Sequence, residues 1–147
     1  MGVGGRVTLG VFAVLALVFG GAWAVGQAQA NALRLAVAVS PRVVPADGQT
    51  PVTITVRIQN PDGTPRVGDT IDALDVSQNS GTLLIYRQLT DRRGQVSFSY
   101  TPAMANQFVP TLPAKIQITD SSLGNLVEID RMMTVSVNVI DPSTIKK

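Results

Sequence analysis

The hydrophobic pattern of the chain changes once, near residue 31. Residues Val7 to Val25 form a run of 19 positions without a charged side chain. From residue 33 onward, short segments alternate between apolar and polar residues, which is the period-two pattern of half-buried strands. No stretch with the 3.6-residue period of an amphipathic helix follows residue 31. The pattern predicts one N-terminal helix followed by an all-β domain.

Seven segments carry the strand pattern, namely residues 33–39, 52–59, 70–77, 81–87, 95–101, 115–119 and 131–140. The clearest is 52–59, where β-branched residues fill most positions. Within 70–77 the apolar residues change phase between Ala73 and Leu74, which predicts a bulge or a strand that switches sheets. Tyr86 and Tyr100 lie at strand parity, so both are expected to pack in the core.

Two turn motifs separate predicted strands. From Asn60 to Pro65, prolines with a fixed φ flank Gly63, so the chain is expected to reverse there. From Thr90 to Gly94, Asp91 can accept hydrogen bonds from backbone amides while Gly94 takes the left-handed conformation. Strands with such turns between them predict an Ig-like antiparallel β-sandwich of about seven strands. We expect this domain to cover residues 31–141, with a polar tail at 142–147.

Three short motifs carry a family resemblance: Pro45-Ala46-Asp47-Gly48, Pro61-Asp62-Gly63-Thr64-Pro65, and Thr90-Asp91 with Gly94. With them, residues 33–140 resemble the bacterial Ig-like domain of the invasin and intimin family. In that family these are turn and strand-entry positions, so the resemblance implies a fold and an extracytoplasmic location without a catalytic or binding site. Those adhesins present tandem modules on an outer-membrane barrel or other large anchor, whereas this chain has one module and at most one helix.

The N-terminal apolar run has two interpretations. Its 19 residues are close to the length that crosses a bilayer as a helix. Arg6 precedes the run, so the positive-inside rule places the N-terminus in the cytoplasm of a bacterium, with Trp23 in the outer aromatic belt. Alternatively, Ala28-Gln29-Ala30 supplies the small residues that a signal peptidase reads, which predicts a secreted or surface-displayed adhesion module beginning near Asn31. Both interpretations place the β domain outside the cytoplasm.

Small residues recur every four positions along the predicted helix, at Ala16, Gly20, Ala24 and Ala28. Such a stripe allows a second helix to approach closely, and it is our candidate helix-packing interface. The alternative is that glycine and alanine are simply common in membrane helices and in signal peptides. Residues 1–30 are thus expected to form either an anchor or a cleaved leader.

Charge and composition narrow the function classes. Of the 12 Lys and Arg residues, three (Arg6, Lys146 and Lys147) lie outside the predicted domain, leaving nine against ten Asp and Glu. This balance gives no reason to expect a nucleic-acid partner. The chain has no cysteine and no histidine, which excludes disulfides, thiolate chemistry, imidazole catalysis and the commonest zinc ligands.

The chemistry-bearing residues that remain give no catalytic pattern. Asp69, Asp72 and Asp75 form the one acidic cluster, but strand geometry places Asp72 on the opposite face, so solvated charges are preferred to a calcium site. Lys115 opens an alternating strand and is expected to face solvent. We therefore expect no enzyme activity, no cofactor, no metal and no small-molecule substrate.

The apolar connection Ala103 to Pro113 is a candidate contact region. Phe108, Val109 and Leu112 could form a partner-contact loop, or the loop could fold over one end of the sandwich. The layout of one helix and one domain, taken with the small-residue stripe and the lack of a catalytic pattern, predicts an accessory subunit of a larger membrane or envelope complex. Its expected partners are the bilayer and other membrane-protein subunits.

Overall fold

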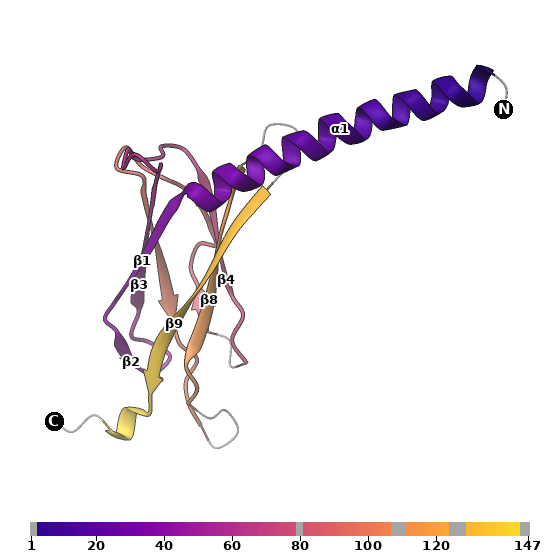
Figure 1. The fold of residues 1–147 in the computed structure, drawn as a ribbon. Helices are drawn as coiled ribbons and strands as arrows, with labels where there is room; N and C mark the ends of the chain where they lie inside the picture. The colour runs from indigo at the N-terminus through magenta and orange to yellow at the C-terminus, as the bar shows by residue number, and fades with distance from the viewer. Residues whose placement is uncertain (1–2, 79–80, 107–110, 124–128, 145–147) are drawn as a thin grey trace.

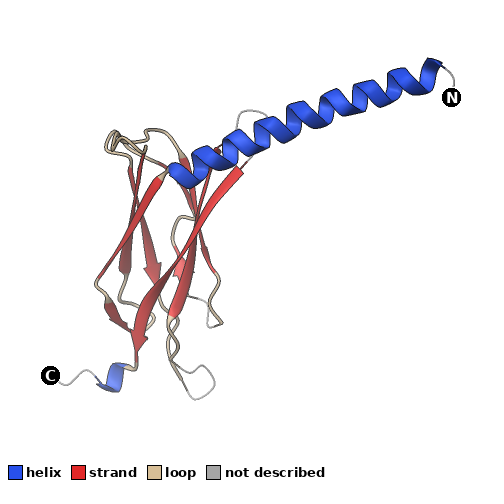
Figure 2. Ribbon diagram, in the orientation of Figure 1, coloured by secondary structure: helices blue, strands red, loops and turns tan. Residues whose placement is uncertain are grey.

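The change of pattern near residue 31 separates an α-helix from a β-sandwich in the computed structural model (Figures 1 and 2). The structure describes residues 3–78, 81–106, 111–123 and 129–144. Its elements are α1 (Val3–Ala32), β1 (Arg34–Ser40), β2 (Val43–Pro45), β3 (Val52–Gln59), β4 (Thr70–Asp75), β5 (Thr82–Leu83), β6 (Arg87–Leu89), β7 (Gln95–Thr101), β8 (Ala114–Leu123), β9 (Ile129–Ile140) and the short 3₁₀ helix η1 (Pro142–Thr144).

Two sheets face each other across the core. One has the strand order β1-β3-β7-β5, and the other has the order β2-β9-β8-β4-β6. Every strand pair is antiparallel except β2 with β9, which is parallel. This pair corrects the expectation of a wholly antiparallel sandwich. After Ser40 the chain crosses from the first sheet to the second in the short connection Pro41–Arg42, and β2 then runs beside β9.

The core lies between the inner faces of the two sheets. In β3, inward and outward positions alternate as predicted, and the inward residues Val52, Ile54, Val56 and Ile58 are at most 1% exposed. In β7, Phe98 and Tyr100 are buried to the same degree. Burying apolar side chains of this size removes them from water, and this is the main force that holds the two sheets together. The Ig-like β-sandwich is therefore confirmed.

Two predicted strands differ from the observed ones. Strand β4 keeps an unbroken register with β8 from Ile71 to Asp75, so the predicted bulge or sheet switch within 70–77 is wrong. Leu74 simply faces outward and is 59% exposed. The switch occurs instead within 81–87, which was predicted as one strand. Leu84 N donates to Ser99 O of the first sheet, and Tyr86 O accepts from Ala73 N of the second.

This crossing also changes the environment of Tyr86. Its side chain is 69% exposed, so the expectation that it packs in the core is wrong, whereas Tyr100 is fully buried as expected. The described part of the chain forms nine strands rather than about seven, because 81–87 becomes β5 and β6 and because β2 was not predicted. A strand of three residues is too short to display a period-two pattern.

The predicted turns form as the sequence indicates. Gly63 and Gly94 have φ values of 88° and 67°, in the left-handed region that glycine enters without steric cost. Asp91 Oδ1 accepts hydrogen bonds from Arg93 N and Gln95 N at 2.8 and 2.9 Å. These bonds close the turn between β6 and β7.

Helix α1 projects from one end of the sandwich, and the C-terminal residues leave from the opposite end (Figure 1). Within Gly10–Ala32, the most apolar window of 18 residues has a mean hydropathy of 1.9, and the helix is long and apolar enough there to cross a membrane. Leu33 alone separates α1 from β1. The domain is therefore joined to the helix without a flexible stalk.

Candidate interaction surfaces

The last turns of α1 pack on the sandwich through small residues. Gly26 and Ala30 are buried, and Leu33, just after the helix, is 7% exposed. Helix α1 contacts β9 and β8 at this end. Arg131 Nη1 of β9 donates a hydrogen bond to Asn31 Oδ1 at 3.2 Å, which ties the end of the helix to the sheet. This junction fixes the direction in which the helix leaves the domain.

The stripe predicted as the helix-packing interface lies on another face of α1. Residues two apart on a helix are separated by about 200° of rotation, so Ala24 and Ala28 point away from the face that carries Gly26 and Ala30. All four stripe residues, Ala16, Gly20, Ala24 and Ala28, are exposed. A Cβ placed on Gly20 would meet no atom within 4 Å. The stripe is open to a neighbouring helix, and its role stays a prediction.

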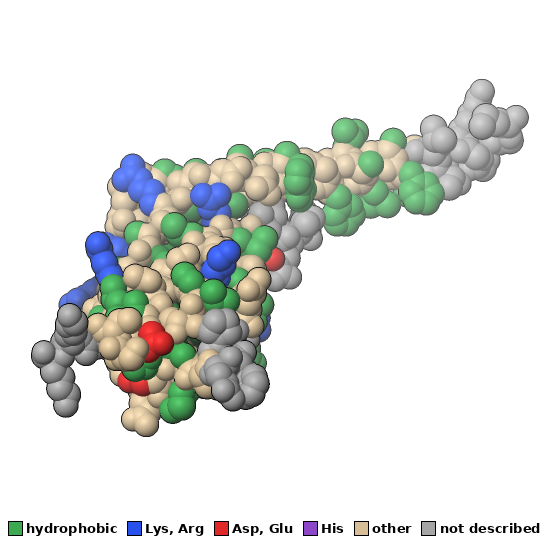
Figure 3. Space-filling view, turned by 90° about the horizontal axis from the view of Figure 1, so that it is seen from below, with side chains coloured by type: hydrophobic (Ala, Val, Ile, Leu, Met, Phe, Trp, Pro, Cys, Tyr) green, Lys and Arg blue, Asp and Glu red, His purple; other side chains and the backbone are tan. Residues whose placement is uncertain are grey.

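Most of α1 exposes apolar side chains on several sides, as Figure 3 shows beyond the sandwich. Only 6% of its most apolar 18-residue window is buried. Phe12 is 68% exposed, Leu17 is 76% exposed, and Trp23, the predicted interfacial anchor, is 53% exposed. The side chain of Arg6, the other predicted anchor, lies outside the described residues. A helix that is apolar on several sides is a candidate membrane span, since a bilayer supplies apolar surroundings.

The predicted partner-contact loop is described only in part. Phe108 and Val109 lie outside the described residues. Leu112 is 37% exposed, and it lines an open cavity of about 360 Å³ together with Pro113, Val76 and Lys115. Lys115 is exposed, as expected for the solvent-facing end of a strand.

The three residues of the acidic cluster are engaged separately. Asp69 pairs with Arg66, and Asp72 accepts from Arg87 Nε and Nη2 at 2.6 and 2.8 Å. Asp75 accepts from Ser77 N at 2.9 Å and from Gly81 N at 2.8 Å, which orders the chain after β4. Within the described ranges, no three His, Cys, Asp or Glu side chains come together as metal ligands.

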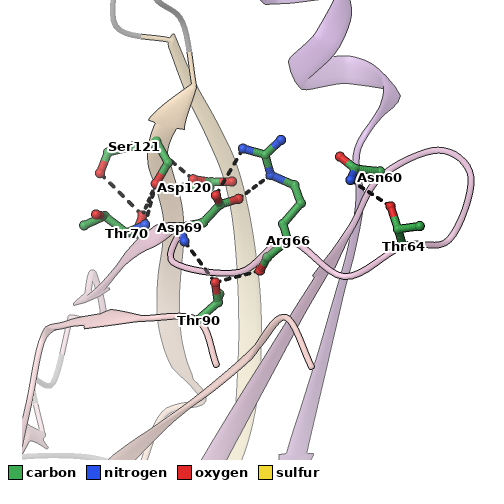
Figure 4. A network of polar contacts seen from close by, with 9 residues as sticks. Asn60, Thr64, Arg66, Asp69, Thr70, Thr90, Asp120 and Ser121 are labelled. Atoms are coloured by element: carbon green, nitrogen blue, oxygen red, sulfur yellow. Dashed lines mark hydrogen bonds and ion pairs between the residues drawn. The ribbon is translucent and has the colours of Figure 1, made fainter. Parts of the chain in front are cut away.

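A polar network closes the helix-proximal end of the sandwich (Figure 4). Arg66 binds Asp69 through two nitrogens, with Nη2 at 3.1 Å from Oδ1. Thr90 Oγ1 accepts from Asp69 N at 2.9 Å and donates to Arg66 O at 2.7 Å. Asp69 also raises the pKa of the Arg66 guanidinium, mainly through their hydrogen bonds. The network joins the loop before β4 to the turn after β6.

Asp120 of β8 lies beside this network and is fully buried. Its Oδ1 accepts a hydrogen bond from Ser122 N at 3.0 Å, while its Oδ2 has no hydrogen-bond partner among the described residues. Burial raises the pKa of the Asp120 carboxyl, and the nearby Asp69 adds to the rise, while Ser122 N and Arg66 act in the opposite direction. The sequence analysis did not single out Asp120. Its position was a usable signal, because Asp120 directly follows the predicted strand 115–119 at an inward-facing position, where the pKa of a carboxyl is expected to be shifted.

A second exposed apolar feature lies where the chain crosses between the sheets. Leu84, Ile85 and Tyr86 are 77%, 48% and 69% exposed, and Leu89 of β6 is 64% exposed. We call these four residues the crossing strip. The sequence analysis does not indicate this strip, because it predicts 81–87 as one alternating strand. The consecutive apolar residues Leu83, Leu84 and Ile85 break that alternation, which is the signal that could have indicated it.

Neither a protein-family model nor a curated relative matches this sequence. Among solved structures, the chain is similar to the adhesin InvE of Yersinia pseudotuberculosis, with a TM-score of 0.54 and 16% identity over 73% of this chain and 26% of that chain. It is also similar to the D00-D0 domain of intimin, with a TM-score of 0.48 and 13% identity over 74% and 46% of the two chains. The D0-D1 domain of intimin gives a TM-score of 0.44 at 18% identity over 71% and 49%. This chain spans less than half the length of each, and the similarity to InvE supports an Ig-like fold of the invasin and intimin type.

Proposed function

We propose that this protein is a non-catalytic, membrane-anchored accessory subunit of a bacterial membrane or envelope complex. In this proposal, α1 spans the cytoplasmic membrane, the N-terminus is cytoplasmic and the Ig-like domain lies outside. The main support is the junction of helix and sandwich. Because α1 continues into β1 with only Leu33 between them, an inserted helix holds the domain next to the bilayer surface. From that position the domain can cover a membrane partner but cannot reach far from the membrane.

The outward-facing stripe gives the anchor a second role. A 19-residue helix span extends for about 28 Å, which matches the hydrocarbon thickness of a bilayer. Within that layer, Gly20 and Ala24 would allow the backbone of a partner helix to approach closely. The domain-facing side, with Gly26 and Ala30, is already occupied by the sandwich. Helix packing in the bilayer and domain contacts outside it would then act together.

The second candidate is a secreted or surface-displayed adhesion module that is released by cleavage after Ala30. The similarity to a Yersinia adhesin favours it. The burial of Ala30 weighs against it, since this residue is 0% exposed and belongs to the core cluster of the sandwich. Cleavage there would remove one core residue and uncover Leu33.

The deciding experiment is purification from native membranes in mild detergent through a C-terminal tag. Mass spectrometry would determine both the N-terminus and the co-purifying proteins. An intact N-terminal segment with stoichiometric membrane partners supports the accessory subunit. A chain that begins near Asn31 and purifies alone would overturn that proposal and support the adhesion module.

A further inference from the structure

The edge of the sandwich between β1 and β9 is incompletely covered. Both strands run down from the end of α1 (Figure 1), β1 in one sheet and β9 in the other. Strand β2 pairs with β9 only from Asn138 to Ile140. Along the described strands, no partner pairs with the remaining part of β9 on that side, and β1 pairs only with β3. Two strand edges with free backbone groups therefore border the same opening.

The inward-facing residues of β9 are buried beside β2 and become more exposed beyond the end of β2. In β9, Val137 and Val139 lie beside β2 and are 0% and 8% exposed. Beyond β2, Val135 is half-buried and Met133 is 41% exposed, although both face inward. In β1, the inward-facing residues Leu35, Val37 and Val39 are also only half-buried. The core is thus covered where β2 lies beside β9 and open where β2 is absent.

This opening forms a groove with a defined chemistry. A cavity of about 420 Å³ is lined by Val37, Ala38 and Val39 on one side, by Ser136 and Asn138 on the other, and by Arg42. Arg42 is exposed, and none of the described residues that line this cavity is acidic. Arg42 is the one charged side chain among the described residues that line the cavity, so the groove has an apolar floor and a cationic residue beside β2.

We propose that this groove accepts an extended segment of a partner protein as an added β-strand. The main chain of the segment pairs with the free edge of β9, and its alternate aliphatic side chains cover Val37, Val39 and Val135. An acidic residue of the segment lies against Arg42, because the exposed guanidinium is the charged group of the cavity lining. The inference rests on the proposed function in one respect, since it names the kind of contact that an accessory subunit would make.

The test uses the purified full chain in detergent and a labelled synthetic peptide of sequence Asp-Thr-Val-Thr-Val-Thr-Val-Asp. Its control peptide has the same composition with the three valines consecutive, which abolishes the alternation. We expect saturable binding of the first peptide by fluorescence anisotropy, and slower amide hydrogen exchange in β9 between Met132 and Val137. Equal binding of both peptides, or no binding of either, would overturn the proposal.

A charge exchange tests the orientation at Arg42. Arg42→Glu should weaken the acidic peptide about 5- to 10-fold, and a peptide with lysines in place of both aspartates should then bind more tightly to the variant than to the parent. Arg57→Glu is the matched control, since Arg57 is also exposed but lies on the outward side of β3, and it should change binding less than twofold. Equal effects of the two substitutions would mean nonspecific charge attraction and would contradict a groove site.

Native partners provide a separate readout. A photo-reactive residue at Ser136, which lines the groove, should cross-link to a segment that alternates aliphatic residues and carries a carboxylate, whereas one at Gln117 of β8, which does not line the groove, should not. Cross-links that map to helices or to folded loops would overturn the added strand. If the peptide does not bind but the protein co-purifies with stable membrane partners, only the groove proposal is overturned. If the peptide binds but the protein has no such partners, only the accessory-subunit proposal is overturned.

Discussion

Gly94 lies directly against the carbonyl oxygen of Ile58, and Ile58 N donates a hydrogen bond to Gly94 O at 2.9 Å. A Cβ on Gly94 would stand 2.5 Å from that carbonyl oxygen and 3.0 Å from Arg66 N. Both contacts are with backbone, so neither can move away as a flexible side chain would. The turn before β7 is therefore built around the absence of a side chain at this position.

Gly94→Ala should destabilise the domain by at least about 3 kcal/mol, since the left-handed backbone costs about 1–2 kcal/mol and the clash adds to it. Gly63→Ala is the matched control. Gly63 also has a positive φ, but a Cβ there would meet no described atom within 4 Å, so only the backbone cost of about 1–2 kcal/mol is expected. Urea unfolding of both variants measures the difference. Equal losses would show that the close approach to Ile58 does not matter.

Phe98 and Tyr86 test which aromatic residues belong to the core. Phe98 is 1% exposed, so Phe98→Ala should cost about 3–5 kcal/mol of unfolding free energy through lost burial and a cavity. Tyr86→Ala removes a side chain that is 69% exposed and should change stability by less than about 0.5 kcal/mol. Chemical denaturation measures both. A loss above about 2 kcal/mol for Tyr86→Ala would place the crossing strip in the core and return 81–87 to a single buried strand.

Asp120 and the turn aspartates should act on stability in opposite directions as the pH falls. The raised pKa of buried Asp120 means that the folded state takes up its proton before the unfolded state does, so this residue increases stability as the pH falls from the folded pKa toward 3.8. The pKa values of Asp47 and Asp91 are lowered by hydrogen bonds from Thr50 and Gln95 respectively. Those two residues stabilise the fold above pH 3.8 and lose that effect as the pH falls through their folded pKa values.

Asp120→Asn should therefore remove the gain in stability above pH 3.8 and leave the loss at lower pH. Urea midpoints measured from pH 7 down to pH 3 would reveal both parts. Asp72→Asn serves as the control, because the pKa of Asp72 is lowered by its hydrogen bonds with Arg87, so it should reduce stability at neutral pH instead. A parent protein whose stability falls steadily from pH 7 to pH 4 would contradict the assignment to Asp120.

Most of the fold could be predicted because the patterns that indicate strands and turns lie within short stretches of the sequence. Strand β3 was predicted with its observed bounds, Val52–Gln59, and Gly94 was predicted with its left-handed backbone. Features that depend on distant contacts were not predictable in this way. The crossing at Leu84–Tyr86 depends on hydrogen bonds to Ser99 and Ala73, which lie in different sheets. Strand β2 exists because β9 offers it an edge, and its three residues carry no pattern of their own.

The candidate surfaces likewise divide into features that local patterns indicate and features that depend on distant contacts. The stripe on α1 could be identified from spacing alone, but its direction depends on Gly26 and Ala30, which pack on the sandwich and turn the stripe outward. The groove between β1 and β9 could not be identified from the sequence, because the inward residues of β1 have the same alternation as those of the fully covered β3. The edge of β9 is covered where β2 pairs with it and open beyond the end of β2.

The two faces of α1 should respond differently to the same substitution. Leu placed at both Gly20 and Ala24 fills the outward stripe, so it should separate the protein from its membrane partners while the melting temperature of the sandwich stays unchanged. Leu placed at Gly26 is the control, since that residue is buried against the sandwich and a large side chain there should disturb the junction beside Ala30. Co-purification from membranes and thermal unfolding in detergent measure the two effects. If the Gly20 and Ala24 variant retains its partners in full, the stripe is not a docking face, and contacts of the Ig-like domain must carry the association.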